Sequence, residues 1–175
     1  MNRALSPTCV IVMGVSGSGK TTLGHAMAQR WGVDFIEADR LHSASAIEKM
    51  ASGVPLDDND RLPWLRAVGT RLRDEVSAGC GSVGACSALK REYRDVLRTY
   101  VPSAFFVELD GPLDVVSERV QLRHHEFMSP ALLASQYATL EPLEPDELGL
   151  RVDLTLGVEE VVDLVERALV NQSLL

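Results

Sequence analysis

A glycine-rich segment near the N-terminus carries the residues best suited to chemistry. It satisfies the pattern G-x-x-x-x-G-K-[ST] and consists of Gly14, Val15, Ser16, Gly17, Ser18, Gly19, Lys20, Thr21 and Thr22. Glycines permit a tight loop whose backbone N–H groups point inward, where they can donate hydrogen bonds to phosphate oxygens. An apolar run precedes the segment and a helical pattern follows it, so a helix N-terminus adds partial positive charge. The segment therefore predicts a phosphate-binding loop.

Two side chains of this loop have separate expected roles. The ammonium group of Lys20 supplies a full charge for the β and γ phosphates of a nucleotide, and the hydroxyl group of Thr21 is suited to Mg²⁺. GTPases, motor ATPases and kinases all share such a loop. A switch GTPase would carry D-x-x-G after its third segment and N-K-x-D later, and the sequence has neither at those places. A length of 175 residues also disfavours a large ATPase.

Two carboxylates follow the second apolar run. Glu37 and Asp39 are two residues apart at the end of a predicted strand, so their side chains lie on the same side. In an open parallel sheet this edge faces the ligand crevice. A carboxylate there can accept the proton of an attacking hydroxyl group or help to hold Mg²⁺ through water. We assign Asp39 to the hydroxyl group and Glu37 to the metal, with a solvated acidic turn as the alternative.

Basic residues gather after the third apolar run. Lys90, Arg94 and Arg98 are spaced i, i+4 and i+8, which places three cations on one face of a predicted helix. In a chain with 17 basic and 25 acidic residues, this stripe is a candidate site for a substrate carboxylate or a transferring phosphate. A solvated helix face is the alternative. Arg61, which follows an acidic run, is a second candidate for binding a carboxylate.

Short apolar runs alternate with longer segments of helical spacing. The expected strands are Cys9 to Met13, Val33 to Ile36, Ser82 to Cys86, Phe105 to Leu109 and Val152 to Leu156. The expected helices are Leu23 to Trp31, Leu65 to Val76, Leu89 to Tyr100, Leu113 to Leu122 and Val158 to Val170. This alternation predicts a doubly wound α/β domain, with a parallel sheet of five strands and helices on both faces. Irregular insertions at 41–63 and 124–145 are expected to be binding loops or lids.

Composition limits the classes of partner. The chain is 46% hydrophobic and 24% charged, which is typical of a soluble globular domain, and its formal net charge of -8 disfavours nucleic acid. No apolar stretch approaches the roughly 20 residues that a membrane span needs. The three cysteines, Cys9, Cys80 and Cys86, lie in or beside apolar runs, which predicts buried thiols and a reducing compartment. We expect a cytoplasmic protein with one domain over residues 1–175.

Several segments resemble those of the gluconokinase family. They are KMASGVPLDDNDRLPWL at 49–65, CSALKR at 86–91 with YRD at 93–95, and LLASQ at 132–136 with LE at 140–141. With the phosphate loop they cover most of the chain in the family's order. The resemblance implies the three-layer P-loop NTPase fold, related to shikimate and adenylate kinases, and the phosphorylation of D-gluconate by ATP with Mg²⁺ to give 6-phosphogluconate. It also implies a homodimer, a substrate-binding flap at about residues 41–64 and a lid at about residues 123–131.

The resemblance assigns roles to individual residues. Asp39 would be the general base, and His42, Arg61, Lys90 and Arg94 would bind gluconate with it. The nucleotide would be held by the phosphate loop, namely Gly14, Ser16, Gly17, Ser18, Gly19, Lys20, Thr21 and Thr22.

Two arginines before the second insertion resemble lid arginines of these kinases. Arg123 would close on the γ phosphate, where a guanidinium group stabilises charge, and Arg119 would lie near the adenine. An exposed helix face is the alternative for both. Lys20, Asp39 and Arg123 together form the expected catalytic group.

The sequence departs from the family pattern in places. The family's G-D-x-x-H-P-x-x-N corresponds here to Ala38, Asp39, His42, Ser43 and Ala46. Glu126 also stands before Phe127, where the family often has histidine. These departures leave open another sugar acid or a shikimate-like hydroxy acid as the acceptor. They also leave open a nucleotide-binding sensor that has lost catalysis.

Overall fold

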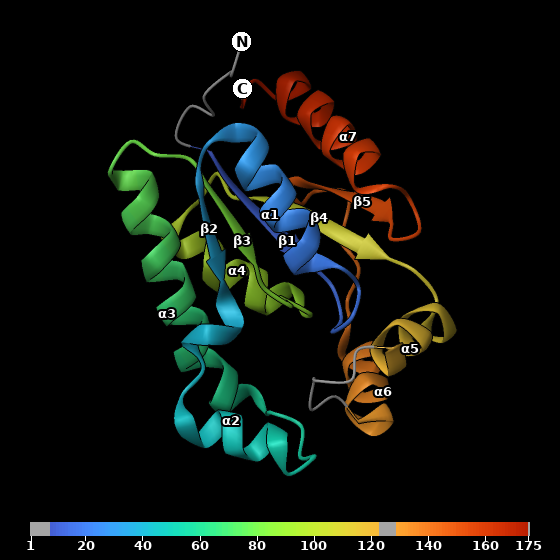
Figure 1. Cartoon of the computed structure of the whole chain (residues 1–175). Coiled ribbons are helices and arrows are strands. Elements are labelled where there is room, and N and C mark those ends of the chain that lie inside the picture. Colours follow the sequence, from blue (N-terminus) through green and yellow to red (C-terminus); the bar gives the residue numbers. More distant parts are fainter. Residues whose placement is uncertain (1–7, 123–128, 175) are drawn as a thin grey trace.

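The computed structural model describes residues 8–122 and 129–174, which form a parallel sheet with strand order β2-β3-β1-β4-β5 (Figure 1). The strands are β1 (Cys9–Met13), β2 (Asp34–Glu37), β3 (Ser82–Ala85), β4 (Phe105–Asp110) and β5 (Gly149–Asp153). The strands β2 and β3 lie on one side of β1, and β4 and β5 lie on the other, so the direction in which strands are added reverses at β1. A ligand crevice is expected at such a switch point, beyond the carboxyl ends of the strands. The predicted doubly wound fold is confirmed.

Helices cover both faces of the sheet. The helices α1 (Lys20–Trp31) and α7 (Val158–Asn171) lie on one face, and α3 (Asp58–Ser77) and α4 (Arg91–Tyr100) lie on the other (Figure 1). Successive residues of the central strand supply both layers, because side chains alternate along a strand. Val10 and Val12 pack with α1 and α7, whereas Ile11 and Met13 pack with α3 and α4. Burial on both sides explains why β1 reads as a continuous apolar run.

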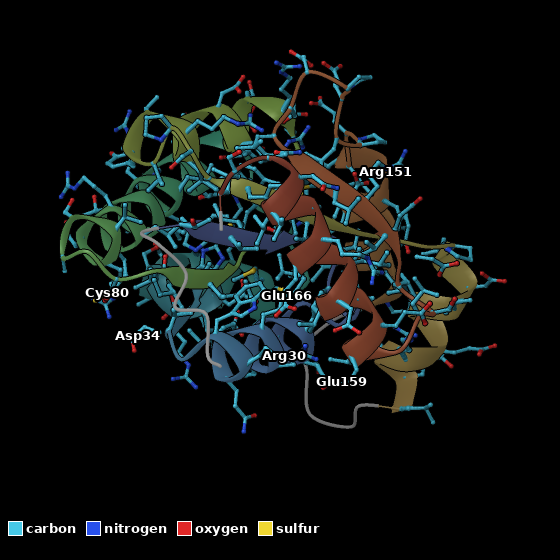
Figure 2. All side chains as sticks on the ribbon, turned by 90° about the horizontal axis from the view of Figure 1, so that it is seen from above. Arg30, Asp34, Cys80, Arg151, Glu159 and Glu166 are labelled. Atoms are coloured by element: carbon cyan, nitrogen blue, oxygen red, sulfur yellow. The ribbon has the colours of Figure 1, made fainter. Side chains whose placement is uncertain are left out.

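Exposed ion pairs join the two helices of the first layer. Arg30 on α1 contacts Glu159 and Asp163 on α7, and a third carboxylate, that of Glu166, lies 3.7 Å from its guanidinium group (Figure 2). Surface pairs of this kind contribute about 0–1 kcal/mol each. The apolar contacts beneath them therefore hold this layer in place.

The remaining helices gather at the carboxyl end of the sheet. They are the 3-10 helix η1 (Ala38–Leu41), α2 (Ala44–Ala51), α5 (Leu113–Leu122) and α6 (Pro130–Thr139). Figure 1 shows α2 on one side of this end and α5 with α6 on the other. The hydroxyl group of Ser43 accepts a hydrogen bond from the Ala46 N–H and caps α2, so the serine that departs from the family pattern has a local structural role. The predicted lid at about 123–131 lies mostly outside the described residues.

Two elements differ from the sequence-based expectation. The fifth strand ends at Asp153 because Leu154 and Leu156 belong to the following turn, where both pack against the core. The third helix begins at Asp58, not at Leu65, and the acidic residues expected to form a loop are its cap. The carboxylate of Asp57 accepts from the Asp60 N–H, while that of Asp60 accepts from the Asp57 N–H. This reciprocal pair is a capping box.

The three cysteines are free thiols with different exposure. Cys9 and Cys86 are buried as predicted, and burial raises the pKa of each thiol to about 12. Cys80 is exposed on the surface beyond α3, which corrects the expectation that all three would be buried (Figure 2). In the part of the chain that the structure describes, no helix is both long enough and apolar enough to cross a membrane.

Candidate active site

The phosphate loop has the backbone that its glycines predict. Gly14, Gly17 and Gly19 have φ angles of 139°, 78° and 105°, values that residues with a Cβ atom rarely adopt. A Cβ atom on Gly17 would also lie 2.4 Å from Cγ2 of Val120, so α5 packs directly against the loop. Lys20 is the first residue of α1, and its Nζ donates to the Val15 carbonyl across the loop at 2.9 Å. This hydrogen bond joins the ammonium group of Lys20 to the first part of the loop.

The metal-side residues lie next to each other. The Thr21 hydroxyl group donates to Oε2 of Glu37 at 2.7 Å, which joins the start of α1 to the end of β2. Both groups offer oxygen atoms, the ligands that Mg²⁺ prefers. Among the described residues no cluster of three or more His, Cys, Asp or Glu could hold a metal. Nucleotide phosphates would therefore have to supply the remaining ligands, as in P-loop enzymes generally.

A pocket of about 460 Å³ opens beside the phosphate loop. Its walls come from the loop, η1, α2, the start of α3, the turn after β3, and α6. The lining residues are Ser16, Lys20, Asp39, His42, Ile47, Met50, Ala51, Pro55, Leu56, Arg61, Ser87, Leu132, Ser135 and Gln136. The predicted charged groups Lys20, Asp39 and Arg61 thus meet in one cavity. Its volume falls within the range of small-molecule sites.

Asp39 lines this pocket from the 3-10 helix η1. The indole N–H of Trp64 donates to the Ala38 carbonyl at 2.7 Å and so fixes the backbone next to Asp39. The Asp39 side chain is 70% exposed, so an acceptor could reach it from the cavity. Its Oδ1 lies 3.9 Å from Nε2 of His42.

His42 is a buried wall of the same pocket. Its ring stacks on Trp64 with centroids 4.3 Å apart, and Nδ1 has no hydrogen-bond partner among the described residues. Burial lowers the pKa of His42, although Asp39 opposes the effect, so the site favours the neutral form of the ring. A neutral imidazole with an unpaired nitrogen suits a hydrogen bond to a hydroxyl group of a ligand.

Arg61 brings a buried positive charge to the pocket. The residue is only 9% exposed, its Nε donates to the Leu56 carbonyl at 3.2 Å, and its guanidinium group lies 5.7 Å from the centre of the Tyr93 ring. No carboxylate of the described residues lies within ion-pair distance of it, although most buried charges are paired. An anionic group of a ligand would supply the partner.

Lys90 and Arg94 are not brought to this pocket. Lys90 donates to Asp58 at 2.9 Å and to Glu92 at 3.2 Å, so carboxylates of the chain already neutralise its charge. Arg94 is fully buried and forms a bidentate ion pair with Glu147 at 2.7 and 2.6 Å. The stripe predicted to bind an anionic substrate is thus occupied by internal carboxylates. A role for Lys90 and Arg94 in binding the substrate therefore stays a prediction.

Arg94 instead supports the wall behind the pocket. Its five N–H groups are matched by protein oxygens, two on Glu147 and one each on the carbonyl groups of Ala88, Glu141 and Pro142. Ala88 has a φ of 41°, which is unusual for a residue with a side chain. The adjoining Ser87 lines the pocket. Arg94 therefore fixes a strained turn at the edge of the site.

A second pocket of about 340 Å³ lies against the phosphate loop. Its lining is mostly apolar: Gly17, Ser18, Gly19, Thr22, Leu23, Leu109, Arg119, Leu122, Leu154, Leu156, Val158 and Val161. Arg119 donates to the Leu154 carbonyl at 3.0 Å and to the Ser18 carbonyl at 3.4 Å, which places its planar guanidinium group at the pocket wall. An apolar cavity beside a phosphate loop suits a nucleotide base. Arg119 is where the sequence-based interpretation expects it, and its role there stays a prediction.

Arg123 lies outside the described residues, as do His124, His125 and Glu126. Sequence reasoning assigned no role to Ser87, Ser135 or Gln136, although all three line the first pocket. The segment that contains Ser135 and Gln136 was recognised only as part of a family resemblance.

Comparison with known proteins identifies relatives of this chain. The family model of the AAA domain matches residues 9–143. A gluconokinase of Gluconobacter oxydans is 47% identical over 148 residues, which cover 85% of this chain and 83% of that protein. The thermosensitive gluconokinase of Escherichia coli is 40% identical, over 90% of this chain and 85% of that protein. The crystal structure of a gluconokinase from Sinorhizobium meliloti superposes with a TM-score of 0.86 at 42% identity, over 97% of this chain and 95% of that one.

The fold, the phosphate loop and the two adjoining pockets define a P-loop kinase that acts on a small molecule. Identities of 40–47% over most of the chain place it more closely. The chain belongs to the gluconokinase family.

Proposed function

We propose that the chain transfers the γ-phosphoryl group of ATP to the terminal hydroxyl group of D-gluconate and so forms 6-phospho-D-gluconate. The observation that carries this proposal is the placement of Lys20, Asp39 and Arg61 around one cavity. The cavity joins a cation for the phosphate, a carboxylate for the proton, and a buried guanidinium group for a substrate carboxylate. The curated names of the relatives support the same acceptor.

Each group has a distinct task in the reaction. The terminal oxygen of the acceptor forms a bond to the γ phosphorus, and the bond from that phosphorus to the leaving oxygen of ADP breaks. The proton of the acceptor hydroxyl group passes to the carboxylate of Asp39. Lys20 offsets negative charge on the phosphates, and Arg61 orients the acceptor through its carboxylate.

Mg²⁺ fits the oxygen groups of Thr21 and Glu37, whose oxygen atoms are 2.7 Å apart. When bound, the metal neutralises charge on the nucleotide phosphates. Binding of adenine in the second pocket, closure of Arg123 over the γ phosphate, the flap at 41–64 and a homodimer belong to the same proposal. Sedimentation velocity would test the homodimer.

Replacing Asp39 with asparagine tests the proposal. Asparagine keeps the shape of the side chain but cannot accept the proton, so turnover with D-gluconate should fall about 100- to 10,000-fold, the range for general-base catalysis. Binding of a non-hydrolysable ATP analogue should not change. Asp34→Asn is the control, because Asp34 is an exposed carboxylate at the other end of β2. Near wild-type turnover of Asp39→Asn would refute this role, and an acceptor screen without a response to D-gluconate would refute the substrate.

A further inference from the structure

The side chain of Gln136 forms a direct link between α6 and the phosphate loop. Its Oε1 accepts a hydrogen bond from the backbone N–H of Ser16 at 2.6 Å, although 120 residues separate the two in sequence. Both residues line the first pocket together with Lys20 and Asp39. A side chain from α6 thus lies where the phosphoryl group must pass from one substrate to the other.

This hydrogen bond fixes which way the amide group of Gln136 faces. A backbone N–H can only donate, so the oxygen atom of the amide must face Ser16 and its NH₂ group must face away. Among the described residues no protein atom accepts a hydrogen bond from that NH₂ group, and Gln136 lines the cavity. The amide therefore has two N–H donors left to offer to whatever the cavity holds.

The helix that carries Gln136 is firmly placed. The Ser129 hydroxyl group caps α6 by accepting from the Leu132 N–H, Leu133 is buried in the core, and the Tyr137 hydroxyl group donates to the Gly111 carbonyl at 2.9 Å. Leu132 and Gln136, four residues apart, share the face that lines the pocket. A donor on a fixed helix needs little reorganisation when charge develops nearby.

From this geometry we infer that Gln136 donates a hydrogen bond to the transferring phosphoryl group and holds it in line between the phosphate loop and Asp39. The inference rests on the proposed function. A phosphoryl group in transfer carries negative charge on its equatorial oxygens, which are acceptors, so it matches a pair of N–H donors. Because Oε1 accepts a hydrogen bond from Ser16, the NH₂ group of Gln136 is positioned by the same loop that is expected to bind the nucleotide.

Two substitutions distinguish a hydrogen bond from Gln136 to the phosphoryl group from a role in which Gln136 only holds α6 against the phosphate loop. Gln136→Glu keeps an oxygen that can accept from Ser16 but loses both donors, and Gln136→Met loses donors and acceptor alike. Both variants should lower kcat with D-gluconate about 100-fold, the loss typical of removing one preorganised donor. The affinity of Gln136→Met for a non-hydrolysable ATP analogue should stay near wild type. Its affinity for ADP with aluminium fluoride and gluconate, a planar mimic of the phosphoryl group, should fall in step with kcat.

Tyr137→Phe is the matched control, because it removes a hydrogen bond of α6 that does not face the cavity. This variant should keep the kcat of the wild type. Full activity of Gln136→Met would overturn the inference, as would full activity of Gln136→Glu beside an impaired Gln136→Met, which would indicate bracing alone. Failure of the wild type to phosphorylate gluconate would instead refute the proposed function, so the two failures are distinguishable.

Discussion

The buried guanidinium group of Arg61 should recognise the carboxylate of the acceptor, and its removal should affect acids more than neutral polyols. Arg61→Met keeps a long apolar side chain in the space beneath Tyr93 but removes the charge. Hydrogen bonds to charged groups contribute about 1.5–3 kcal/mol. A bidentate contact at a residue that is 9% exposed belongs at the upper end of this range, at about 3 kcal/mol, which corresponds to about a 100-fold loss of kcat/KM.

The assay compares two acceptors with the same carbon chain. D-gluconate has a carboxylate, and D-glucitol has a hydroxymethyl group in its place. The wild type should have a much higher kcat/KM with gluconate than with glucitol. The Arg61→Met substitution should lower kcat/KM about 100-fold with gluconate but only a few-fold with glucitol. Arg61→Lys keeps the charge without the planar fork and should fall between the two. Equal losses with both acceptors would refute the reasoning, because the damage would then not depend on the carboxylate.

Arg66→Met is the control for the chemical change itself. Arg66 lies on the same helix but is exposed. Its replacement should leave kcat/KM with both acceptors unchanged, and the melting temperature as well. Circular dichroism and the affinity for an ATP analogue would show whether Arg61→Met has also disturbed the fold, since its Nε donates to the Leu56 carbonyl.

Two further predictions concern stability and the loop. Glu147→Gln should lower the free energy of unfolding by about 3–5 kcal/mol in chemical denaturation, because it leaves the buried charge of Arg94 without its partner. Gly17→Ala should weaken ATP binding, measured by calorimetry, because its Cβ atom would collide with Val120. Gly79→Ala is the control: Gly79 has the same φ of 78° with open space around it, so it should cost only about 1–2 kcal/mol of stability.

The pH dependence of stability follows from the same buried carboxylate. Burial alone would raise the pKa of Glu147, but hydrogen bonds from Arg94 and Arg98 outweigh it and lower the pKa to about 2. A carboxylate whose pKa is lowered by folding stabilises the protein above its unfolded value and loses that contribution as the pH falls through the folded value. Acid should therefore destabilise the wild type more than Glu147→Gln between about pH 5 and 2. If acid lowered the stability of the wild type and of Glu147→Gln equally, the prediction for Glu147 would be contradicted. Equal ATP affinities of Gly17→Ala and Gly79→Ala would contradict the prediction for the phosphate loop.

The fold was predictable where burial is continuous. The strand at Cys9 to Met13 is apolar throughout because helices cover both of its faces. The fifth strand lies at the edge of the sheet, and the two leucines that pack against the core here, the buried Leu154 and the partly buried Leu156, follow the strand. An apolar run indicates which residues pack against the core and not which residues form a strand. The run from Val152 to Leu156 therefore predicted the wrong bounds for this strand. The start of α3 could have been found from the spacing of Asp57 and Asp60, which is the signature of a cap.

Predictability of the site depended on sequence distance. Lys20 and Asp39 follow directly from a loop and a strand end, and the structure brings both to one cavity. The ion pair of Arg94 could not be predicted, because its partner Glu147 is 53 residues away and lies in an irregular segment. Gln136 carries no local signal either, since a glutamine on a helix is ordinary until its contact with Ser16 is seen.

The phosphate loop lines both pockets, and this has a consequence for inhibitor design. Ser16 and Lys20 face the cavity of about 460 Å³, whereas Gly17 to Gly19 face that of about 340 Å³. A bisubstrate compound, in which a chain of phosphates tethers adenosine to an aldonic acid, would span the loop and occupy both cavities at once. Since each half would raise the effective concentration of the other, such a compound should bind more tightly than either fragment and resist displacement by ATP alone.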